Sequence, residues 1–341
     1  MLGCISLCAC TSGNSVKNSN SAESTQSEIM EFEEIDASKF NNGNLNICFI
    51  TKTYGNNYWD TLIQGAKDSA EYNNINLYCA SVKNENDTDG LAHLLNEAYD
   101  MQPDAVIVSP ADTIPINDAI NKIHGAKIPL IYVDTIMNGR QFDACFMTDN
   151  MQAGRMVARY MIKKLKEVGY TDTDALCVGI HIGSRNSQTI IERLAGFNEY
   201  WSSNTPENWK VIEPIRCNDG SADTAREQCI EMIDSYNSLA GLIGLNNGST
   251  VGLCNGLTEL ERKDIVLIGF DYSNEIAKLI SEGEYPVATM VQCQYDMGYN
   301  SVTTAIDICN GGSVEYKFID TGVTRIDNSN YNSSSILKLI Q

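Results

Sequence analysis

The sequence predicts an α/β protein made of two lobes, each built on a doubly wound parallel sheet. Its 341 residues exceed the usual size of one hydrophobic core and are enough for two. Hydrophobic residues make up 43% and charged residues 20% of the chain, which is typical of a globular protein. From residue 45 onward, short apolar runs alternate with segments of helical periodicity, the order expected of an α/β fold.

The first half of this pattern predicts five strands and three helices. The strand candidates are residues 46–51, 75–81, 104–110, 129–135 and 144–149. The helix candidates are residues 57–72, 88–100 and 113–125. Runs rich in Val, Ile and Leu without polar alternation indicate strands that are buried on both faces. Their strict alternation with helices implies parallel pairing through right-handed crossovers.

The pattern then changes over near residues 149–174 and repeats. Strands are expected at residues 175–183, 210–217, 239–245, 264–271 and 286–292. Helices are expected near residues 151–168, 187–203, 221–236, 248–259 and 274–282. Asp149 is a candidate N-cap for the first of these helices, because its carboxylate can accept from the free backbone N–H groups there.

Polar and aromatic side chains follow several of these strands, and ligands bind at the carboxyl ends of doubly wound sheets. The residues at these positions are Asn56, Tyr58, Trp59, Asp134, Asn246, Asn247, Asp271 and Gln292. The stretch "NNYWDTLIQGAKDSA" places Tyr58 and Trp59 at a strand-to-helix junction. These rings are either a hydrophobic anchor or a stacking platform for a ligand.

The composition and motifs disfavour several classes of function. A formal net charge of −20 argues against nucleic acid and against docking on anionic lipid. No G-x-S-x-G elbow, P-loop or G-x-G-x-x-G occurs, so neither an enzyme nor a bound cofactor is predicted. The three histidines, His93, His124 and His181, are far apart in sequence, which disfavours a metal site.

The N-terminus resembles a bacterial lipoprotein signal. In "LCAC", Cys10 follows Leu7 and two small residues, and Cys4 in "MLGC" is the weaker alternative. A polar tether over residues 11–44 follows, too poor in apolar side chains to fold. No other stretch is apolar over the roughly 18 residues that a transmembrane helix needs. We therefore expect an extracytoplasmic protein that reaches the membrane through a lipid anchor only.

The other nine cysteines are expected to be mostly buried, unpaired thiols.

Seven segments in order resemble the ribose-type periplasmic sugar-binding proteins over roughly residues 45–325. They are "NNYWDTLIQGA", "IPLIYVDT", "TDNMQAGRMVARYM", "IERLAGF", "LIGLNNGSTVG", "IVLIGFD" and "VATMVQCQYDMG". The resemblance implies the type I periplasmic binding protein fold, in which three chain crossings form a hinge. The lobes would be residues 45–148 plus 293–322, and residues 149–292 plus 323–341.

The resemblance also implies a function and a site. The chain would be a non-catalytic monomer that closes on a monosaccharide-like ligand and delivers it to an ABC permease. Tyr58 and Trp59 would sandwich the sugar ring. Asp134 and Asp271 would accept hydrogen bonds from adjacent hydroxyls. The amides Asn56, Asn246 and Gln292 would complete the polar ring.

The chain departs from the family pattern at three places. Thr135 and Ile191 stand where the family has ligand-binding arginines, and Gly220 or Ser221 replaces an aromatic side chain. Arg185, with Asn186 and Gln188, is the candidate for supplying the missing donors. Arg193 is expected to brace its helix against the lobe. Ribose itself is therefore not the expected ligand; another monosaccharide, a polyol or a nucleoside-like furanose stays open.

Three alternative functions use the same sequence features. The first is a receptor of this fold that signals to a membrane kinase or chemoreceptor. The second is the effector domain of a transcriptional repressor, which needs a basic, helical DNA-binding segment that residues 1–44 do not resemble. The third is a glycoside-processing enzyme, in which Asp134 and Asp271 would be the catalytic carboxylate pair.

Overall fold

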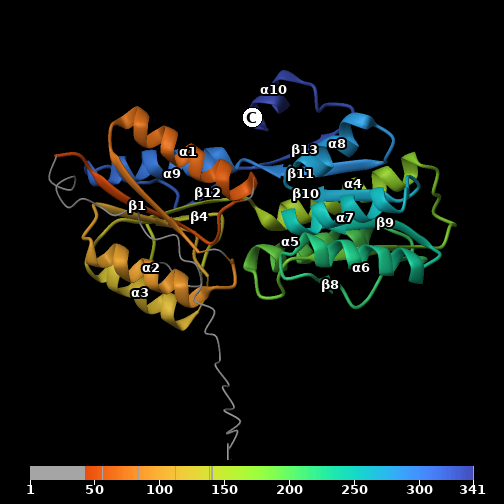
Figure 1. Cartoon of the computed structure of the whole chain (residues 1–341), viewed down its shortest axis with the longest axis horizontal. Coiled ribbons are helices and arrows are strands. Elements are labelled where there is room, and N and C mark those ends of the chain that lie inside the picture. The colour runs from red at the N-terminus through yellow and green to blue at the C-terminus, as the bar shows by residue number, and fades with distance from the viewer. Residues whose placement is uncertain are drawn as a thin grey trace, which may run out of the picture.

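The structure consists of two α/β lobes that lie side by side (Figure 1). It is a computed structural model that describes residues 43–340, apart from Asn56, Lys83, Asp112, Asn138 and Arg140. The proposed lipid-attachment positions Cys4 and Cys10 therefore lie outside the described residues, as does Asn56. No helix in the described part of the chain is long and apolar enough to cross a membrane.

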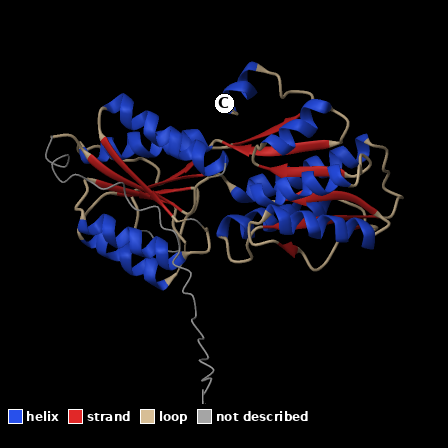
Figure 2. Cartoon of the chain, in the orientation of Figure 1, coloured by secondary structure: helices blue, strands red, loops and turns tan. Residues whose placement is uncertain are grey.

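The first lobe contains a parallel sheet to which six described strands contribute, in the order β12-β5-β4-β3-β1-β2. The strands are β1 (Asn46–Thr51), β2 (Asn76–Ser81), β3 (Ala105–Val108), β4 (Leu130–Val133), β5 (Ala144–Met147) and β12 (Phe318–Asp320). Its helices are α1 (Asn57–Asn73), α2 (Thr88–Asp100), α3 (Ile114–Gly125) and α9 (Gln294–Cys309). Helices α1 and α9 cover one face, and α2 and α3 cover the other (Figures 1 and 2).

The second lobe contains the described strands β13-β11-β10-β9-β6-β7, and β8 also pairs with β6. The strands are β6 (Leu176–Ile182), β7 (Trp209–Val211), β8 (Arg216–Cys217), β9 (Leu239–Gly244), β10 (Val266–Phe270), β11 (Val287–Gln292) and β13 (Val323–Asp327). The helices are α4 (Asn150–Glu167), α5 (Gln188–Asn204), α6 (Ala222–Ser235), α7 (Asn247–Glu259), α8 (Asn274–Glu282) and α10 (Ser334–Leu339). Only β13 among these strands pairs antiparallel, with β11.

Each sheet is buried on both faces because successive side chains of a strand point to opposite sides. In β1, Cys48 and Ile50 enter the core beneath α2 and α3. Ile47 and Phe49 enter the core beneath α1 and α9. This arrangement explains the continuous apolar runs and confirms the predicted α/β fold.

The chain passes between the two sheets three times. It leaves β5 for α4 near Thr148, leaves β11 for α9 near Cys293, and leaves β12 for β13 near Gly322. Hydrogen bonds tie the crossings together: Thr148 Oγ1 donates to Gln292 Oε1 at 3.0 Å, and the backbone N–H of Asp149 donates to Asp320 Oδ1 at 3.0 Å. Because these short segments are adjacent, they can act as one hinge.

The eight predicted helices agree with α1 to α8 to within one or two residues, whereas α9 and α10 were not predicted. Asp149 does cap α4 by accepting from the N–H of Gln152 at 2.9 Å. The strand expected at residues 210–217 is instead divided into β7 and β8. Pro214 lies between them and has no N–H to donate to a ladder. The edge strands β12 and β13 were not predicted, because their residues are largely exposed or half-buried.

The cysteines were predicted to be mostly buried and unpaired, and this is confirmed. All nine cysteines in the described residues are free, and Cys48, Cys145, Cys177, Cys229 and Cys254 are buried. Burial raises the pKa of several of these thiols, so they stay protonated and behave as small hydrophobic side chains.

Candidate functional site

A cleft with a volume of about 1060 Å³ lies between the lobes, at the carboxyl ends of both sheets. The first lobe contributes the loops after β1, β2 and β4, and the second contributes the loops after β6, β8, β9 and β10 and the last residue of β11, Gln292. In each sheet the strand order reverses here, between β1 and β3 and between β6 and β9. Such a switch point is where doubly wound folds bind their ligands.

Asp134 and Asp271 occupy equivalent places in the two lobes. Each follows a central strand, β4 or β10, and each has a left-handed backbone, with φ of 65° and 66°. Their backbone N–H groups donate to Phe146 O and Met290 O on the neighbouring strand, both at 2.8 Å. Asp tolerates this conformation better than most residues. The turn directs both carboxylates into the cleft.

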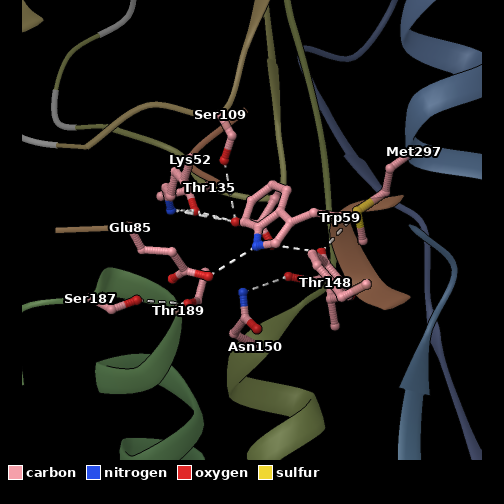
Figure 3. A network of polar contacts seen from close by, with 12 residues as sticks. Lys52, Trp59, Glu85, Ser109, Thr135, Thr148, Asn150, Ser187, Thr189 and Met297 are labelled. Atoms are coloured by element: carbon pink, nitrogen blue, oxygen red, sulfur yellow. Dashed lines mark hydrogen bonds and ion pairs between the residues drawn. The ribbon is translucent and has the colours of Figure 1, made fainter. Parts of the chain in front are cut away.

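The carboxylate of Asp134 is surrounded by donors from four positions in the first lobe. Three of these residues, Lys52, Ser109 and Thr135, are labelled in Figure 3. Tyr58 Oη donates to Oδ1 at 2.6 Å. Thr135 Oγ1 donates to Oδ2 at 2.6 Å, and Ser109 Oγ and Lys52 Nζ lie 3.4 Å from the same oxygen. Burial acts to raise the pKa of Asp134, but the charge of Lys52 and the hydrogen bonds outweigh it and hold the pKa below its usual value.

Lys52 is a cationic residue of the cleft that the sequence analysis missed. Its ammonium group bonds Thr135 Oγ1 and Asp134 Oδ2, and its side chain is 10% exposed. It lines the cavity. The residue directly follows the strand 46–51, so the rule that singled out the other strand-end residues would have found it.

The carboxylate of Asp271 has fewer donors. Gln292 Nε2 donates to Oδ1 at 2.9 Å, and Oδ2 accepts no hydrogen bond from the described residues. Burial raises the pKa of Asp271 to about 6, with the negative charge of Asp134 acting in the same direction, while Arg193 and Gln292 oppose the shift. Asp271 is therefore ionised at neutral pH and protonates in mild acid.

Arg193 braces α5 against the lobe, as expected, but it also lines the cleft. Its guanidinium donates to Asn150 Oδ1 at 2.8 Å, Leu245 O at 2.9 Å and Gln292 Oε1 at 2.9 Å, and it lies 3.7 Å from the centre of the Phe270 ring. A guanidinium has five N–H donors; the described residues accept three of them, which leaves two for a ligand. Arg193 was not among the predicted ligand-binding residues.

Tyr58 and Trp59 both line the cleft and are nearly buried, with exposed fractions of 6% and 3%. Their rings meet edge to face, with centroids 5.1 Å apart. The indole N–H of Trp59 donates to Glu85 Oε1 at 2.9 Å (Figure 3). Burial and the charge of Asp134 raise the pKa of Tyr58 well above its usual value, so its hydroxyl remains a donor. Tyr58 thus belongs both to the hydrophobic core of the first lobe and to the wall of the cleft.

The other predicted site residues have different positions. Asn246 lines the cleft, and its Oδ1 accepts from Ser249 Oγ at 2.5 Å. Thr135 is buried behind Asp134 and is not a lining residue. Arg185 is exposed, lies outside the lining residues and donates to Ile215 O at 2.8 Å. The structure therefore brings the cations Lys52 and Arg193, rather than Arg185, to the cleft.

The described residues contain no group of three His, Cys, Asp or Glu side chains that could hold a metal ion. The chemistry of the cleft is that of hydrogen bonding and stacking. Carboxylates and amides can pair with hydroxyl groups, and the aromatic side chains can contact an apolar ring face.

Comparison with known proteins identifies the family. Residues 47–313 match the periplasmic binding protein domain family, and the chain belongs to it. It is 21% identical over 280 residues to the D-ribose/D-allose-binding protein of Pseudomonas aeruginosa, covering 80% of this chain and 84% of that protein. It is 19% identical over 272 residues to the ribose import binding protein of Escherichia coli, covering 80% and 87%.

A solved structure confirms the fold. The carbohydrate transporter solute-binding protein of Agrobacterium radiobacter, in complex with D-arabinose, superimposes with a TM-score of 0.80 at 23% sequence identity. The match covers 88% of this chain and 99% of that one. The resemblance to ribose-type periplasmic binding proteins is thus confirmed.

Proposed function

We propose that this protein is an extracytoplasmic solute-binding protein that closes its lobes on a monosaccharide-like ligand and delivers it to an ABC importer. The observation that carries the proposal is the cleft itself. One carboxylate from each lobe, Asp134 and Asp271, enters a single cavity that also contains Tyr58 and Trp59. A sugar offers the matching surfaces, a hydroxyl rim and an apolar ring face.

The relatives support the importer role. Those named above are sugar-binding or import proteins, so a receptor that signals without transport is not favoured. Binding proteins of this family are not enzymes, and we extend that to this chain. Asp134 is held ionised by Lys52 and three hydroxyl donors, which suits a binding residue and leaves it a poor general acid.

The proposed motion is closure about the three crossings. We assign residues 45–148 plus 293–322 to one lobe and residues 149–292 plus 323–341 to the other. A sugar that contacts both lobes binds the closed form more tightly and shifts the population toward it. The membrane partner would then recognise the closed form of a monomer.

Thermal unfolding with a panel of sugars tests the proposal. The panel contains D-ribose, D-allose, D-arabinose and D-tagatose, with adenosine and L-leucine as non-sugar compounds. A sugar at about 1,000 times its Kd should add about 4 kcal/mol to the free energy of unfolding. A rise in Tm with one sugar class is the expected result. A response to adenosine or leucine alone, or to none of the compounds, contradicts the sugar assignment.

We further propose that Cys10 carries the lipid that tethers the protein to the membrane. The proposal rests on the "LCAC" sequence and the polar segment after it. Labelling with an alkyne fatty acid in a bacterial host tests it. The wild-type chain and Cys4→Ser should incorporate the label, whereas Cys10→Ser should not. Label retained in Cys10→Ser and lost in Cys4→Ser would move the attachment to Cys4.

A further inference from the structure

The two carboxylates of the cleft differ in how many of their acceptor sites are already used. A carboxylate has about four lone-pair sites, two on each oxygen. Asp134 Oδ2 is approached by Thr135, Lys52 and Ser109, and Oδ1 accepts from Tyr58. Four donors thus already approach the roughly four acceptor sites of Asp134, which is close to saturated.

Asp271 has room for more. Gln292 Nε2 is its single hydrogen-bond donor among the described residues. About three lone-pair sites stay available on a residue that is only 5% exposed and lines the cleft. A buried carboxylate with so few donors is costly, which agrees with its raised pKa. A pair of ligand hydroxyls on Asp271 would remove that cost.

Lys52 has a hydrogen-bond donor that the described residues do not use. An ammonium group has three N–H donors, and the described residues accept two of them, at Asp134 and Thr135. The third remains on a side chain that lines the cleft. The wall of the first lobe therefore presents a charged donor, whereas Asp271 on the opposite wall presents an acceptor.

We propose that Lys52 is a ligand-binding and specificity-determining residue, which donates to an oxygen of the sugar while Asp271 accepts from hydroxyls at the opposite edge. This inference rests on the proposed function. It specifies the ligand as an uncharged polyhydroxylated ring bound in one orientation. Acidic side chains outnumber Lys52 and Arg193 among the described lining residues, so sugar phosphates and sugar acids are excluded by repulsion.

The test compares Lys52→Met with the wild type by isothermal titration. The probes are D-ribose, D-allose, D-arabinose and D-tagatose, the monodeoxy analogues of whichever of them binds, and D-ribose 5-phosphate. Lys67→Met, on the exposed face of α1 in the same lobe, is the matched control. We expect Lys52→Met to weaken binding by about 10- to 100-fold, as a lost charged hydrogen bond does, and Lys67→Met to leave affinity unchanged. D-ribose 5-phosphate should bind neither variant nor the wild type.

The deoxy analogues separate direct contact from a merely structural role. If Lys52 donates to one oxygen, removal of that oxygen should weaken binding to the wild type but not to Lys52→Met. Equal losses across all analogues, or unchanged affinity in Lys52→Met, would overturn the inference and leave the proposed function standing. Failure of the wild type to bind any of the sugars would contradict the proposed function and this inference together.

Discussion

At the scale of single residues, the site depends on two aspartates that share a backbone geometry but differ in surroundings. Asp134 has a charged partner and three hydroxyl donors, so its pKa is lowered. Asp271 has one amide donor, so burial raises its pKa to about 6. The sequence predicted both carboxylates from their places after strands. It could not predict the difference, because Lys52, Tyr58 and Ser109 come from separate segments that only the folded lobe brings to Asp134.

The raised pKa of Asp271 predicts that sugar binding depends on pH. Ligand hydroxyls donate to the ionised carboxylate, which is fully present well above pH 6 and is lost as the pH falls through that value. If only the ionised form binds, affinity should fall about tenfold for each pH unit below 6. Titration calorimetry between pH 5 and 8 measures this. In Asp271→Asn, binding should be weaker at pH 8 and nearly independent of pH; a pH-independent wild type would refute the role.

The pairing of Asp134 with Lys52 predicts coupled effects on stability. Asp134→Ala leaves the largely buried ammonium without its counter-charge, and breaking a buried ion pair costs up to about 3–5 kcal/mol. Lys52→Met leaves the carboxylate unpaired in the same way. The double variant should therefore lose less unfolding free energy than the sum of the two single variants. Chemical denaturation of the four proteins measures the coupling, and strict additivity would show that the pair is not coupled.

His181 predicts a loss of stability in acid. Burial and the charge of Arg216 lower its pKa to about 3, while a polar contact with Gln228 opposes the shift without reversing it. Neither ring nitrogen has a hydrogen-bond partner among the described residues. The unfolded chain binds a proton at this residue below about pH 6.5 and the folded chain does not, so stability falls as the pH falls from 6.5 toward 3.

The comparison of His181→Met with the wild type isolates this effect. Asp271 shifts stability in the opposite direction over an overlapping pH range, but it is present in both proteins. In urea unfolding, the variant should gain stability relative to the wild type by up to about 1.4 kcal/mol for each pH unit below 6.5. A difference that stays constant with pH would mean that His181 is protonated in the folded protein.

At the scale of elements, the close packing of α4 and α5 positions Arg193. A Cβ atom at Gly154 on α4 would overlap the carbonyl oxygen of Arg193 on α5, and one at Gly196 would overlap that of Met151. The contact allows Arg193 to reach Asn150 and Gln292 at the hinge. The helices were predictable from their periodicity, whereas this approach of two backbones was not visible in the pattern.

The helix contact predicts the effect of adding one methyl group. Gly154→Ala should destabilise the protein by about 1–3 kcal/mol, because the added atom forces α5 outward. Sugar affinity should fall as well, since Arg193 moves with the helix. Gly125→Ala, at the end of α3 with open space around it, is the control and should be neutral or slightly stabilising. Equal Tm values for the two variants would show that the helices can separate without cost.

The strands show which parts of the fold the sequence pattern could predict and which it could not. The central strands were predicted because both of their faces are buried, as in β1 and β9. The edge strand β12 has Phe318 exposed and only two further residues, too few for a period to be seen. The division between β7 and β8 depends on Pro214, whose effect on pairing is local. The short strands at the edges of the sheets were therefore less predictable than the central strands.

At the scale of the whole molecule, hydrogen bonds join the cleft and the chain crossings into one network. Gln292 Nε2 donates to Asp271, and its Oε1 accepts from Arg193 and from Thr148 at the first crossing. A ligand that hydrogen-bonds to Asp271 is thus one contact away from Gln292, the side chain that links the first and second crossings. Contacts to Lys52 in one lobe and Asp271 in the other would stabilise the closed form.

Small-angle X-ray scattering, with and without the sugar of the panel that binds, tests the central claim most directly. Calorimetry on the same sample establishes that the site is occupied. We expect a smaller radius of gyration and a shorter maximum dimension in the saturated protein, and no change in Asp271→Asn at the same sugar concentration. Identical scattering curves for the free and the saturated wild-type protein would contradict closure of the two lobes on a sugar.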